Sequence, residues 1–449
     1  MSAAGIAALP SIVSLRGAGC ARVVAKLLAP NDNTKNQIYL GGNFNVLNVL
    51  PFHSPHAEGS GTSSIIKASV EWQWLQPDGS TVPAPGAQLI LYPQYPEVRL
   101  SGLLRGVPNG KAPNKIIATR DDGRVLLMGI LPDGRVLATA LPAVHPDALV
   151  IRRDHTLFST SGVLLEIPLH DGSPVESDAR NQLLEALLRV HQQGWINGCR
   201  LRAEGPSIPY RAPNGVGYTL EAQLGIRPNG RSDPDFLGWE VKAISGTRPD
   251  HITNSKRVTL LTPNPTGGEF ARIGPAAFVR RYGHVDTHMA DRLNFSGTFR
   301  VGKAVGPHSL ELLVEGFDPA AGTRFDADGA VRLNTTSRNA AIEWSLVKMV
   351  EHWNRKHARA VYVPAITRQT PAGRSYSYGR RVFLGTGTDF ARMLRAVASG
   401  NLVYDPGVKL EHVGGPEESL KQRHQFRIPF SALSSLYERW EQVDLEADA

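Results

Sequence analysis

The sequence predicts a two-domain protein with an all-β N-terminal domain and an α/β C-terminal domain. Its 449 residues exceed the usual size of a single domain, about 100–200 residues. Short apolar or alternating segments separated by Pro-Asp-Gly turns, as at 77–79 and 132–134, fill the first part of the chain. Helical stripes and strand-like segments alternate in the rest. We therefore expect one domain over 1–155, a linker over 156–175 and a second domain over 176–449.

In the first domain, the predicted strands are separated by turns, and this spacing favours a barrel or a sandwich. They cover residues 65–75, 88–92, 115–119, 125–130 and 136–141. In the second domain, apolar residues at helical spacing predict helices over 178–193, 339–356, 390–398 and 431–443. A run of β-branched residues predicts a strand over 360–366.

Composition limits the protein class. Hydrophobic residues make up 41% and charged residues 20%, values typical of a globular chain rather than a disordered one. No apolar run approaches the roughly 20 residues that span a bilayer. Two cysteines, Cys20 and Cys199, offer no disulfide framework, which favours the cytoplasm. Lysine and arginine (49) outnumber aspartate and glutamate (41) by 8, a mild basic excess that permits binding to nucleic acid.

The segment 214–242 carries the clearest chemical pattern. Leu220 and Leu224 lie one helical turn apart and Gly225 is a typical helix stop, so we expect Glu221 on a short helix. In an extended strand at 239–243, Glu240 and Lys242 point to the same face. An aspartate, Asp235, lies just upstream.

These residues suit phosphodiester hydrolysis. Two carboxylates can hold a hard divalent cation, usually Mg²⁺, and a neighbouring lysine can orient the attacking water. The alternative is a surface strand on which Glu240 and Lys242 form a simple ion pair, since Glu-x-Lys is common. The Pro234-Asp235 pair and Glu221 favour the catalytic interpretation.

The C-terminal domain resembles the MvaI/BcnI family of restriction endonucleases, which are PD-(D/E)XK nucleases related to the MutH nickase. The resemblance rests on the stretches at 215–226, 234–242 and 260–265, which read GVGYTLEAQLGI, PDFLGWEVK and LLTPNP. It implies that Asp235, Glu240 and Val241 are metal ligands, that Lys242 is the water-orienting base and that Glu221 is an auxiliary carboxylate. Near the C-terminus, 401–405 and 422–428 resemble the late strand pair of the family. His424-Gln425-Phe426-Arg427 departs there from the family's His-Gly-Thr-x-Phe-Arg-like stretch.

The N-terminal domain resembles the effector domain of the EcoRII type, a B3-like pseudobarrel that grips DNA between two loops. The resemblance rests on 29–42 and 92–102. Asparagine and glutamine can form paired hydrogen bonds with adenine, whereas arginine and lysine can bind guanine or phosphate. The alternative is a pair of solvated loops on a barrel that contacts other proteins. We expect DNA contacts in this domain from Asn31, Asp32, Asn33, Lys35, Asn36, Gln37, Arg99, Arg105, Lys111 and Lys115, and in the C-terminal domain from Arg248, Asp250, His251 and His424.

The expected function is that of a Type II, IIE-like, restriction endonuclease of a bacterial or archaeal cytoplasm. The resemblance implies Mg²⁺-dependent cleavage of double-stranded DNA at a CCNGG-like site, with CCWGG as one form, leaving 5′-phosphate and 3′-hydroxyl ends. It also implies a monomer, contact with one or two copies of the site, and a companion DNA methyltransferase. A MutH-like nickase and a DNA-binding regulator with an inactive nuclease fold are the alternatives. The intact set of Asp235, Glu240 and Lys242 argues against the regulator.

Overall fold

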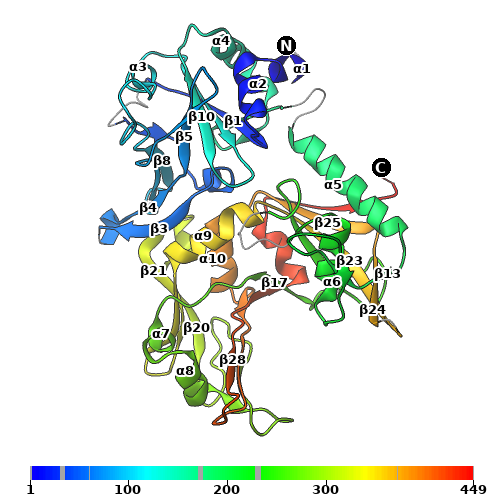
Figure 1. The fold of residues 1–449 in the computed structure, drawn as a ribbon. Helices are drawn as coiled ribbons and strands as arrows, with labels where there is room; N and C mark the ends of the chain where they lie inside the picture. The colour runs from blue at the N-terminus through cyan, green and yellow to red at the C-terminus, as the bar shows by residue number, and fades with distance from the viewer. Residues whose placement is uncertain are drawn as a thin grey trace. The chain divides into compact units, whose positions relative to one another are not determined.

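The computed structural model describes residues 3–30, 36–59, 61–169, 175–227, 234–371 and 373–447. The chain divides into two compact units (Figure 1). The first comprises residues 1–59 and 63–186, and the second comprises residues 60–62 and 187–449. Among the described residues, no helix combines the length and apolar character needed to cross a bilayer.

The first unit is built on two sheets. A seven-stranded sheet has the order β11-β12-β1-β9-β10-β5-β6, and a five-stranded sheet has the order β2-β8-β7-β4-β3. The strands are β1 (Arg22–Leu27), β2 (Ile38–Tyr39), β3 (His53–Glu58), β4 (Ile65–Ser69), β5 (Trp72–Leu75), β6 (Thr81–Pro83), β7 (Gln88–Tyr92), β8 (Glu97–Ser101), β9 (Val125–Ile130), β10 (Val136–Leu141), β11 (Thr160–Ser161) and β12 (Leu164–Ile167).

The core of the first unit lies between the seven-stranded sheet and its helices. Every residue of β9 is buried, as expected of an apolar strand covered on both faces. Ile12 and Leu15 of α2 (Pro10–Gly17) and Ile151 of α4 (Pro146–Arg153) pack into the same cluster. The other helices are α1 (Ala3–Ala7), α3 (Asn114–Ile117) and α5 (Val175–Gln192), the last of which crosses the division between the units. Short 3-10 helices cover Asn45–Asn48, Gly61–Ser63 and His155–Leu157.

Three expectations for this unit need correction. The unit is mostly β but not all-β, because apolar faces of α1, α2 and α4 complete its core. The predicted strand at 115–119 is the helix α3, which buries only Ile117. Part of the predicted linker, 160–167, forms β11 and β12, because β12 pairs with β1 and its apolar residues Leu164, Leu165 and Ile167 are buried. Residues 170–174 of that linker lie outside the described residues.

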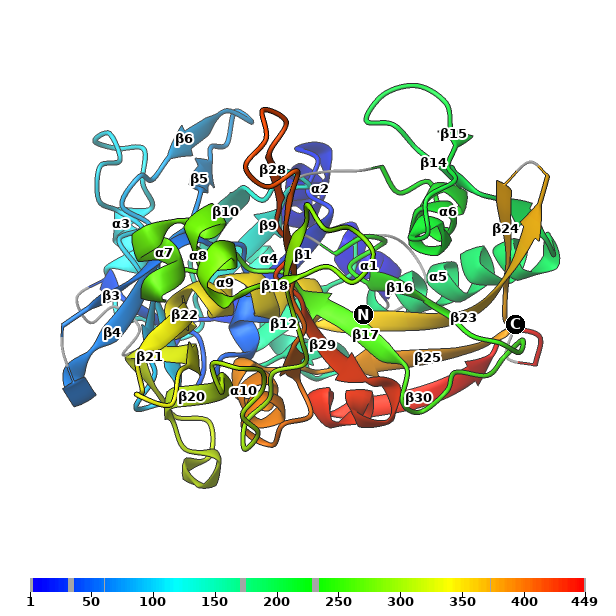
Figure 2. The same ribbon diagram turned by 90° about the horizontal axis from the view of Figure 1, so that it is seen from below.

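The second unit contains a six-stranded sheet, in which β16 runs parallel to β23 (Figure 2). The order is β13-β24-β23-β25-β30, with β16 beside β23. These strands are β13 (Ile196–Asn197), β16 (Glu240–Ser245), β23 (Arg359–Thr370), β24 (Gly373–Tyr378), β25 (Arg381–Thr386) and β30 (Arg439–Asp444).

In its described residues this unit has four smaller sheets. Their strand orders are β14-β15, β17-β29-β26, β18-β19-β27-β28 and β20-β21-β22. Their strands are β14 (Cys199–Arg200), β15 (Ile208–Pro209), β17 (Arg257–Leu261), β18 (His284–Val285), β19 (Leu293–Ser296), β20 (Glu311–Phe317), β21 (Phe325–Asn334), β22 (Ala340–Ser345), β26 (Val403–Tyr404), β27 (Gly407–Glu411), β28 (Ser419–Lys421) and β29 (Phe426–Pro429). The helices are α6 (Gly215–Gln223), α7 (Gly268–Ile273), α8 (Pro275–Tyr282), α9 (Leu346–His357) and α10 (Phe390–Ala398), with 3-10 turns at Pro319–Ala321 and Phe430–Leu436.

Most of the predicted elements of this unit form, but two predicted helices are wrong in part or whole. The segment 339–356 divides into β22 and α9, because residues 340–345 pair with β21 before the helix begins. The segment 431–443 is a 3-10 turn followed by β30, which pairs with the edge of β25. Apolar residues spaced three or four apart at Leu433, Leu436 and Trp440 fit a helix equally well, so sheet pairing decided the outcome.

Candidate active site

A two-residue turn holds the two predicted metal-ligating carboxylates close together. The amide of Phe236 donates to the carbonyl of Trp239 at 2.9 Å, and the amide of Trp239 donates back at 2.8 Å. Leu237 and Gly238 both have positive φ, 49° and 82°, which is the signature of a type I′ turn. Beyond the turn, the amide of Val241 donates to Oδ2 of Asp235 at 3.0 Å. Asp235 therefore folds back onto the first residues of β16.

Glu240 and Lys242 share one face of β16, as the sequence predicted. The Lys242 ammonium contacts Oε1 of Glu240 in a hydrogen-bonded ion pair. A second ammonium, that of Lys356, lies 3.5 Å from the same oxygen. Glu240 is only 2% exposed, so two cations converge on one buried carboxylate.

Sequence reasoning missed Lys356, and the parallel pairing of β16 with β23 explains its position. Glu240 is opposite Ala360 in the sheet register. Lys356 stands near the end of α9, which leads directly into β23, so the helix end lies beside Glu240. The sequence signal was a predicted helix running into a predicted strand. Only the pairing partner of that strand was unknown.

Glu221 reaches the same cluster from α6, which packs against β16. Thr219 is buried and anchors the helix, because its hydroxyl donates to the carbonyl of Cys199 at 3.2 Å and accepts from the Cys199 amide at 3.1 Å. The hydroxyl of Tyr378 in β24 donates to the carbonyl of Val216 at 2.8 Å. These contacts hold α6 so that Glu221 lies near Lys242, and the positive charge of Lys242 acts to lower the pKa of Glu221.

The carboxylates of the cluster differ in their tendency to ionise. Burial, together with the negative charge of Glu240, raises the pKa of Asp235 to about 7. Burial also raises the pKa of Glu221. Burial opposes ionisation of Glu240 as well, but Lys242 and Lys356 outweigh it and lower the pKa of this carboxylate.

The lysine of the cluster remains an ammonium. Burial alone would lower the pKa of Lys242, but its contact with Glu240 outweighs burial and raises that pKa. Burial lowers the pKa of neighbouring His357 to about 3, so this histidine is neutral, and its ring stacks on Trp353. In this state Lys242 can donate hydrogen bonds, but it has no free lone pair with which to accept a proton.

The residues present fit a divalent cation. Oε2 of Glu240 is buried without a hydrogen-bond partner, which is costly unless something binds it. Asp235 offers a second carboxylate, and burial raises its pKa, so the ionised form is disfavoured unless a cation binds. In the described part of the chain, no three or more His, Cys, Asp or Glu side chains are grouped to hold a metal. A cation here would therefore be coordinated by two carboxylates, with main-chain oxygen, water or phosphate as further ligands. This type of coordination is common for Mg²⁺.

The family model of the MvaI/BcnI restriction endonucleases matches residues 184–437, more than half of the chain. The chain belongs to this family. It is a Type II site-specific deoxyribonuclease. The matched region contains all five residues of the cluster, namely Glu221, Asp235, Glu240, Lys242 and Lys356.

Solved structures add only a distant likeness. Restriction endonuclease MvaI in complex with its cognate DNA substrate is 18% identical, with a TM-score of 0.44, over 58% of this chain and 97% of that one. Restriction endonuclease MvaI without DNA is 17% identical, with a TM-score of 0.33, over 59% and 98%. A comparison with curated proteins finds no similar sequence.

The DNA contacts predicted for this MvaI/BcnI family member in its first unit fall into three groups. Asn31, Asp32, Asn33 and Lys35 lie outside the described residues. Arg99 is engaged within the unit, because its guanidinium pairs with Glu97, donates to Oε1 of Gln37 at 3.2 Å and lies over the Tyr92 ring. The remaining predicted residues are exposed to solvent, and they are Asn36, Arg105, Lys111 and Lys115.

Two residues of the second unit that were predicted to contact DNA instead interact with other residues of the protein. The first is His424. His424 is 2% exposed, and its Nδ1 lies 2.8 Å from the hydroxyl of Tyr404. Burial lowers the pKa of His424 to about 4. Its ring packs among aromatic side chains such as Trp344. The prediction that His424 reads bases is therefore wrong for this structure, because the ring faces the core.

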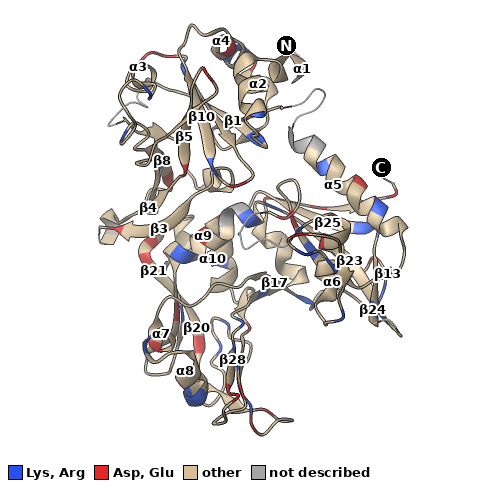
Figure 3. Cartoon of the chain, in the orientation of Figure 1, with Lys and Arg blue, Asp and Glu red and all other residues tan. Residues whose placement is uncertain are grey.

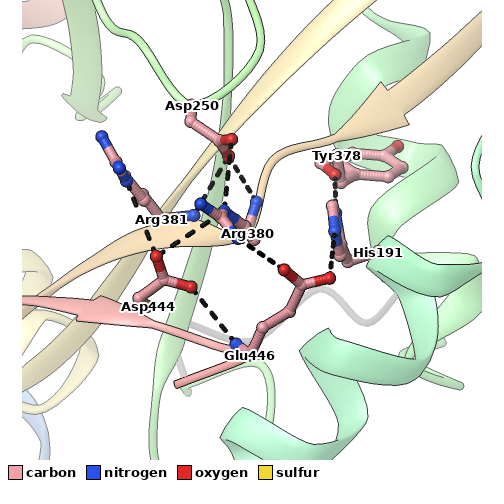
Figure 4. A network of polar contacts seen from close by, with 7 residues as sticks. All are labelled: His191, Asp250, Tyr378, Arg380, Arg381, Asp444 and Glu446. Carbon is pink, nitrogen blue, oxygen red and sulfur yellow. Dashed lines mark hydrogen bonds and ion pairs between the residues drawn. The ribbon is translucent and has the colours of Figure 1, made fainter. Parts of the chain in front are cut away.

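The second, Asp250, belongs to a polar network that ties the strand ends together (Figure 4). Its carboxylate accepts from the amides of Arg380 and Arg381, and it pairs with the Arg380 guanidinium. Arg380 also pairs with Asp444 and Glu446 near the C-terminus. Asp250 thus has a structural role here. Its neighbours Arg248 and His251 remain exposed.

His424 lies in the segment between β28 and β29, and this segment exposes other polar residues. Along 423–428, residues 424, 426 and 428 are buried, whereas Arg423 is exposed and Gln425 is half-buried. Arg423 and Gln425 line a cavity of about 730 Å³ together with Gln422, Lys409 and Lys421. Burial alternates from 423 into β29, so the alternation of polar and apolar residues along 423–428 was the signal that could have identified them.

Basic residues are spread over both units and interspersed with acidic ones (Figure 3). Lys409 and Lys421, for example, both pair with Glu411. The mild positive charge of the whole chain therefore does not by itself locate a nucleic-acid surface.

Proposed function

We propose that this enzyme hydrolyses one phosphodiester bond in each strand of a short CCNGG-like site in double-stranded DNA, with CCWGG as one form, using Mg²⁺ held by Asp235 and Glu240. The observation that carries the proposal is that Asp235, bonded to the Val241 amide, lies beside the Glu240–Lys242 pair, in which Oε2 of Glu240 is buried and has no hydrogen-bond partner. A purely structural ion pair would not need a second carboxylate that burial holds near neutrality.

In the proposed mechanism, Asp235 and Glu240 would hold the cation, aided by the main chain of Val241. When bound, the metal ion neutralises charge on the scissile phosphate and makes bound water more acidic. The Lys242 ammonium donates a hydrogen bond that orients the attacking water and stabilises the negative charge developing on the phosphoryl oxygens. The water oxygen bonds to phosphorus and releases a proton to solvent as the bond between phosphorus and O3′ breaks, and a proton from solvent completes the 3′-hydroxyl. The products are 5′-phosphate and 3′-hydroxyl ends.

Lys242 acts in this scheme as a donor rather than as a proton acceptor. The raised pKa of Lys242 supports this assignment and revises the expectation that it is a base. Lys356 keeps Glu240 ionised and therefore ready to bind the cation. Glu221, on α6, also raises the pKa of Lys242 and so helps to keep it an ammonium.

We also propose two DNA-contacting surfaces. One, on the first unit, comprises Asn36, Arg105, Lys111 and Lys115, and it would provide an effector-type second contact, as in IIE-like enzymes. The other comprises Gln422, Arg423 and Gln425 at the cavity of the second unit, since arginine and glutamine suit guanine and adenine edges. A monomer in a bacterial or archaeal cytoplasm with a companion DNA methyltransferase fits this function.

Plasmid cleavage followed by sequencing of the ends tests the proposal. With Mg²⁺ or Mn²⁺, we expect double-strand breaks at one defined sequence. Ca²⁺ should support binding but not cleavage, because it accepts looser and larger coordination. Nicks alone would identify a MutH-like nickase, and an intact plasmid with a footprint would identify a regulator. Cutting in EDTA would refute the metal-dependent mechanism.

A further inference from the structure

Leu237 stands at the tip of the turn that joins the two metal-binding carboxylates. It is 47% exposed, although leucine is usually buried. It lies two residues after Asp235 and three before Glu240, so its Cα is within about 7 Å of the Cα of Asp235. Nucleotides of one strand follow each other at about 3.4 Å along the helix axis. The side chain is thus within reach of the nucleotides that flank a phosphate held at these carboxylates.

The backbone at Leu237 is unfavourable for leucine. Its φ of 49° lies in the left-handed region, where a Cβ meets the following carbonyl. Type I′ turns favour Asn, Asp or Gly at this position. Leucine therefore disfavours the turn and exposes apolar surface at the same time. Neither property helps the protein fold, and strained residues of this kind cluster at functional sites.

The turn is nevertheless held firmly. Two hydrogen bonds between Phe236 and Trp239 close it, and the Trp239 side chain is buried. Asp235 is tied to the amide of Val241 on the other side. The position of Leu237 in the turn relative to the carboxylates is consequently set before any substrate binds.

We infer that Leu237 is a positioning residue that packs its apolar side chain against the sugar and base next to the scissile phosphate and wedges into that base step. This inference rests on the proposed active site. Apolar side chains inserted between base steps unstack them and bend the backbone. Such a contact would bring the scissile phosphate to Asp235 and Glu240 only when the duplex is fully seated.

The test uses Leu237→Asn, because Asn suits the turn and removes the apolar contact. The substrate is a duplex containing the mapped cleavage site with 2-aminopurine beside the cut. We expect an unchanged or higher Tm and single-turnover cleavage that is slower by about tenfold, equivalent to about 1.4 kcal/mol. We also expect loss of the fluorescence rise that wild-type protein causes on binding in Ca²⁺. Leu237→Met should restore both signals, and Leu157→Asn, at another exposed leucine, should change neither.

Wild-type cleavage and fluorescence by Leu237→Asn would overturn the inference. Glu240→Gln separates this failure from failure of the active-site assignment. If Glu240→Gln is inactive while Leu237→Asn cuts normally, only the role of Leu237 is refuted. If Glu240→Gln cuts normally, the proposed active site itself is refuted.

Discussion

The ammonium of Lys356 lies 3.5 Å from Oε1 of Glu240, although the two residues belong to a helix end and a strand that are far apart in the sequence. The contact arises because α9 leads into β23, the parallel partner of β16. It gives the buried Glu240 a second cation in addition to Lys242. The charge balance of the proposed active site therefore depends on the pairing of two strands.

The first prediction is that Glu240→Ala or Lys242→Ala abolishes cleavage while DNA binding in Ca²⁺ persists. The two side chains share one face of β16 and contact each other, and each has a separate role in the proposed mechanism. A loss of about 10³-fold corresponds to about 4 kcal/mol of barrier. Single-turnover cleavage and gel-shift titration measure the two properties. Near-wild-type cleavage by either variant would remove the active-site assignment.

The second prediction concerns Lys356. Lys356→Ala removes one of the cations that keep Glu240 ionised, so we expect cleavage to slow by about tenfold, or about 1.4 kcal/mol. The effect should be largest at low pH, where Glu240 would begin to bind a proton. Lys348→Ala is the matched control, because Lys348 is on the same helix and pairs with Glu351 instead. Equal pH–rate profiles for Lys356→Ala and the control would contradict the assigned role.

The third prediction is a pH dependence caused by Asp235. Its pKa is about 7 in the folded protein against 3.8 for the free group, so between these values the folded state binds more protons than the unfolded state. The contribution of Asp235 to stability is therefore fully present below about pH 4 and is lost as pH rises through about 7. In metal-free protein, Asp235→Asn should be increasingly stabilising relative to wild type over this interval. Thermal unfolding in EDTA from about pH 5 to 8 measures it, and a constant difference in Tm would contradict it.

The same group makes cation binding depend on pH. A protonated Asp235 is a poor metal ligand, so we expect Mn²⁺ affinity to rise as pH increases through about 7. Calorimetric titration of the full chain measures this, and Asp235→Asn provides the comparison. Affinity that stays constant from about pH 5.5 to 8 would argue against Asp235 as a ligand.

The fourth prediction tests the surface on the first unit. Replacing Lys111 and Lys115 with Ala in the full chain should weaken DNA binding, because fewer phosphates are neutralised. The slope of log K against log salt should become shallower by about 0.9 for each phosphate that no longer has a lysine beside it. Arg135→Ala is the control, because the half-buried Arg135 belongs to the same unit but pairs with Asp133. Unchanged salt slopes for the lysine variants would mean that this surface does not bind phosphate.

The fifth prediction concerns the cavity of the second unit. Arg423→Ala should reduce discrimination between the cleavage site and single-base variants by about 1–3 kcal/mol, which is the usual value of a bidentate hydrogen bond to a base. Conversely, His424→Phe should retain the site preference, since His424 is buried among aromatic rings. Cleavage rates on a panel of variant sites measure both. Relaxed specificity in His424→Phe alone would reverse the assignment.

The sequence alone was enough to identify what depends on local order. Alternation along 239–243 placed Glu240 and Lys242 on one face, and the ion pair between them confirms this. The two leucines and Gly225 predicted the helix that carries Glu221. Helix α10 and strands β7, β9 and β10 formed where apolar periodicity predicted them. Such patterns can be recognised in the sequence because they depend on residues within a few positions of each other.

The tertiary structure decided what depends on partners distant in the sequence. The placement of Lys356 beside Glu240 required the register of β16 against β23. The burial of His424, and with it the exposure of Arg423, depended on the packing of its ring among Phe270, Trp344 and Tyr404, which are distant in the sequence. The segment at 439–444 became a strand because the edge of β25 offered hydrogen-bond partners. Pairing and burial are properties of the whole fold, and the free energy they contribute outweighs the weak local preferences that a sequence displays.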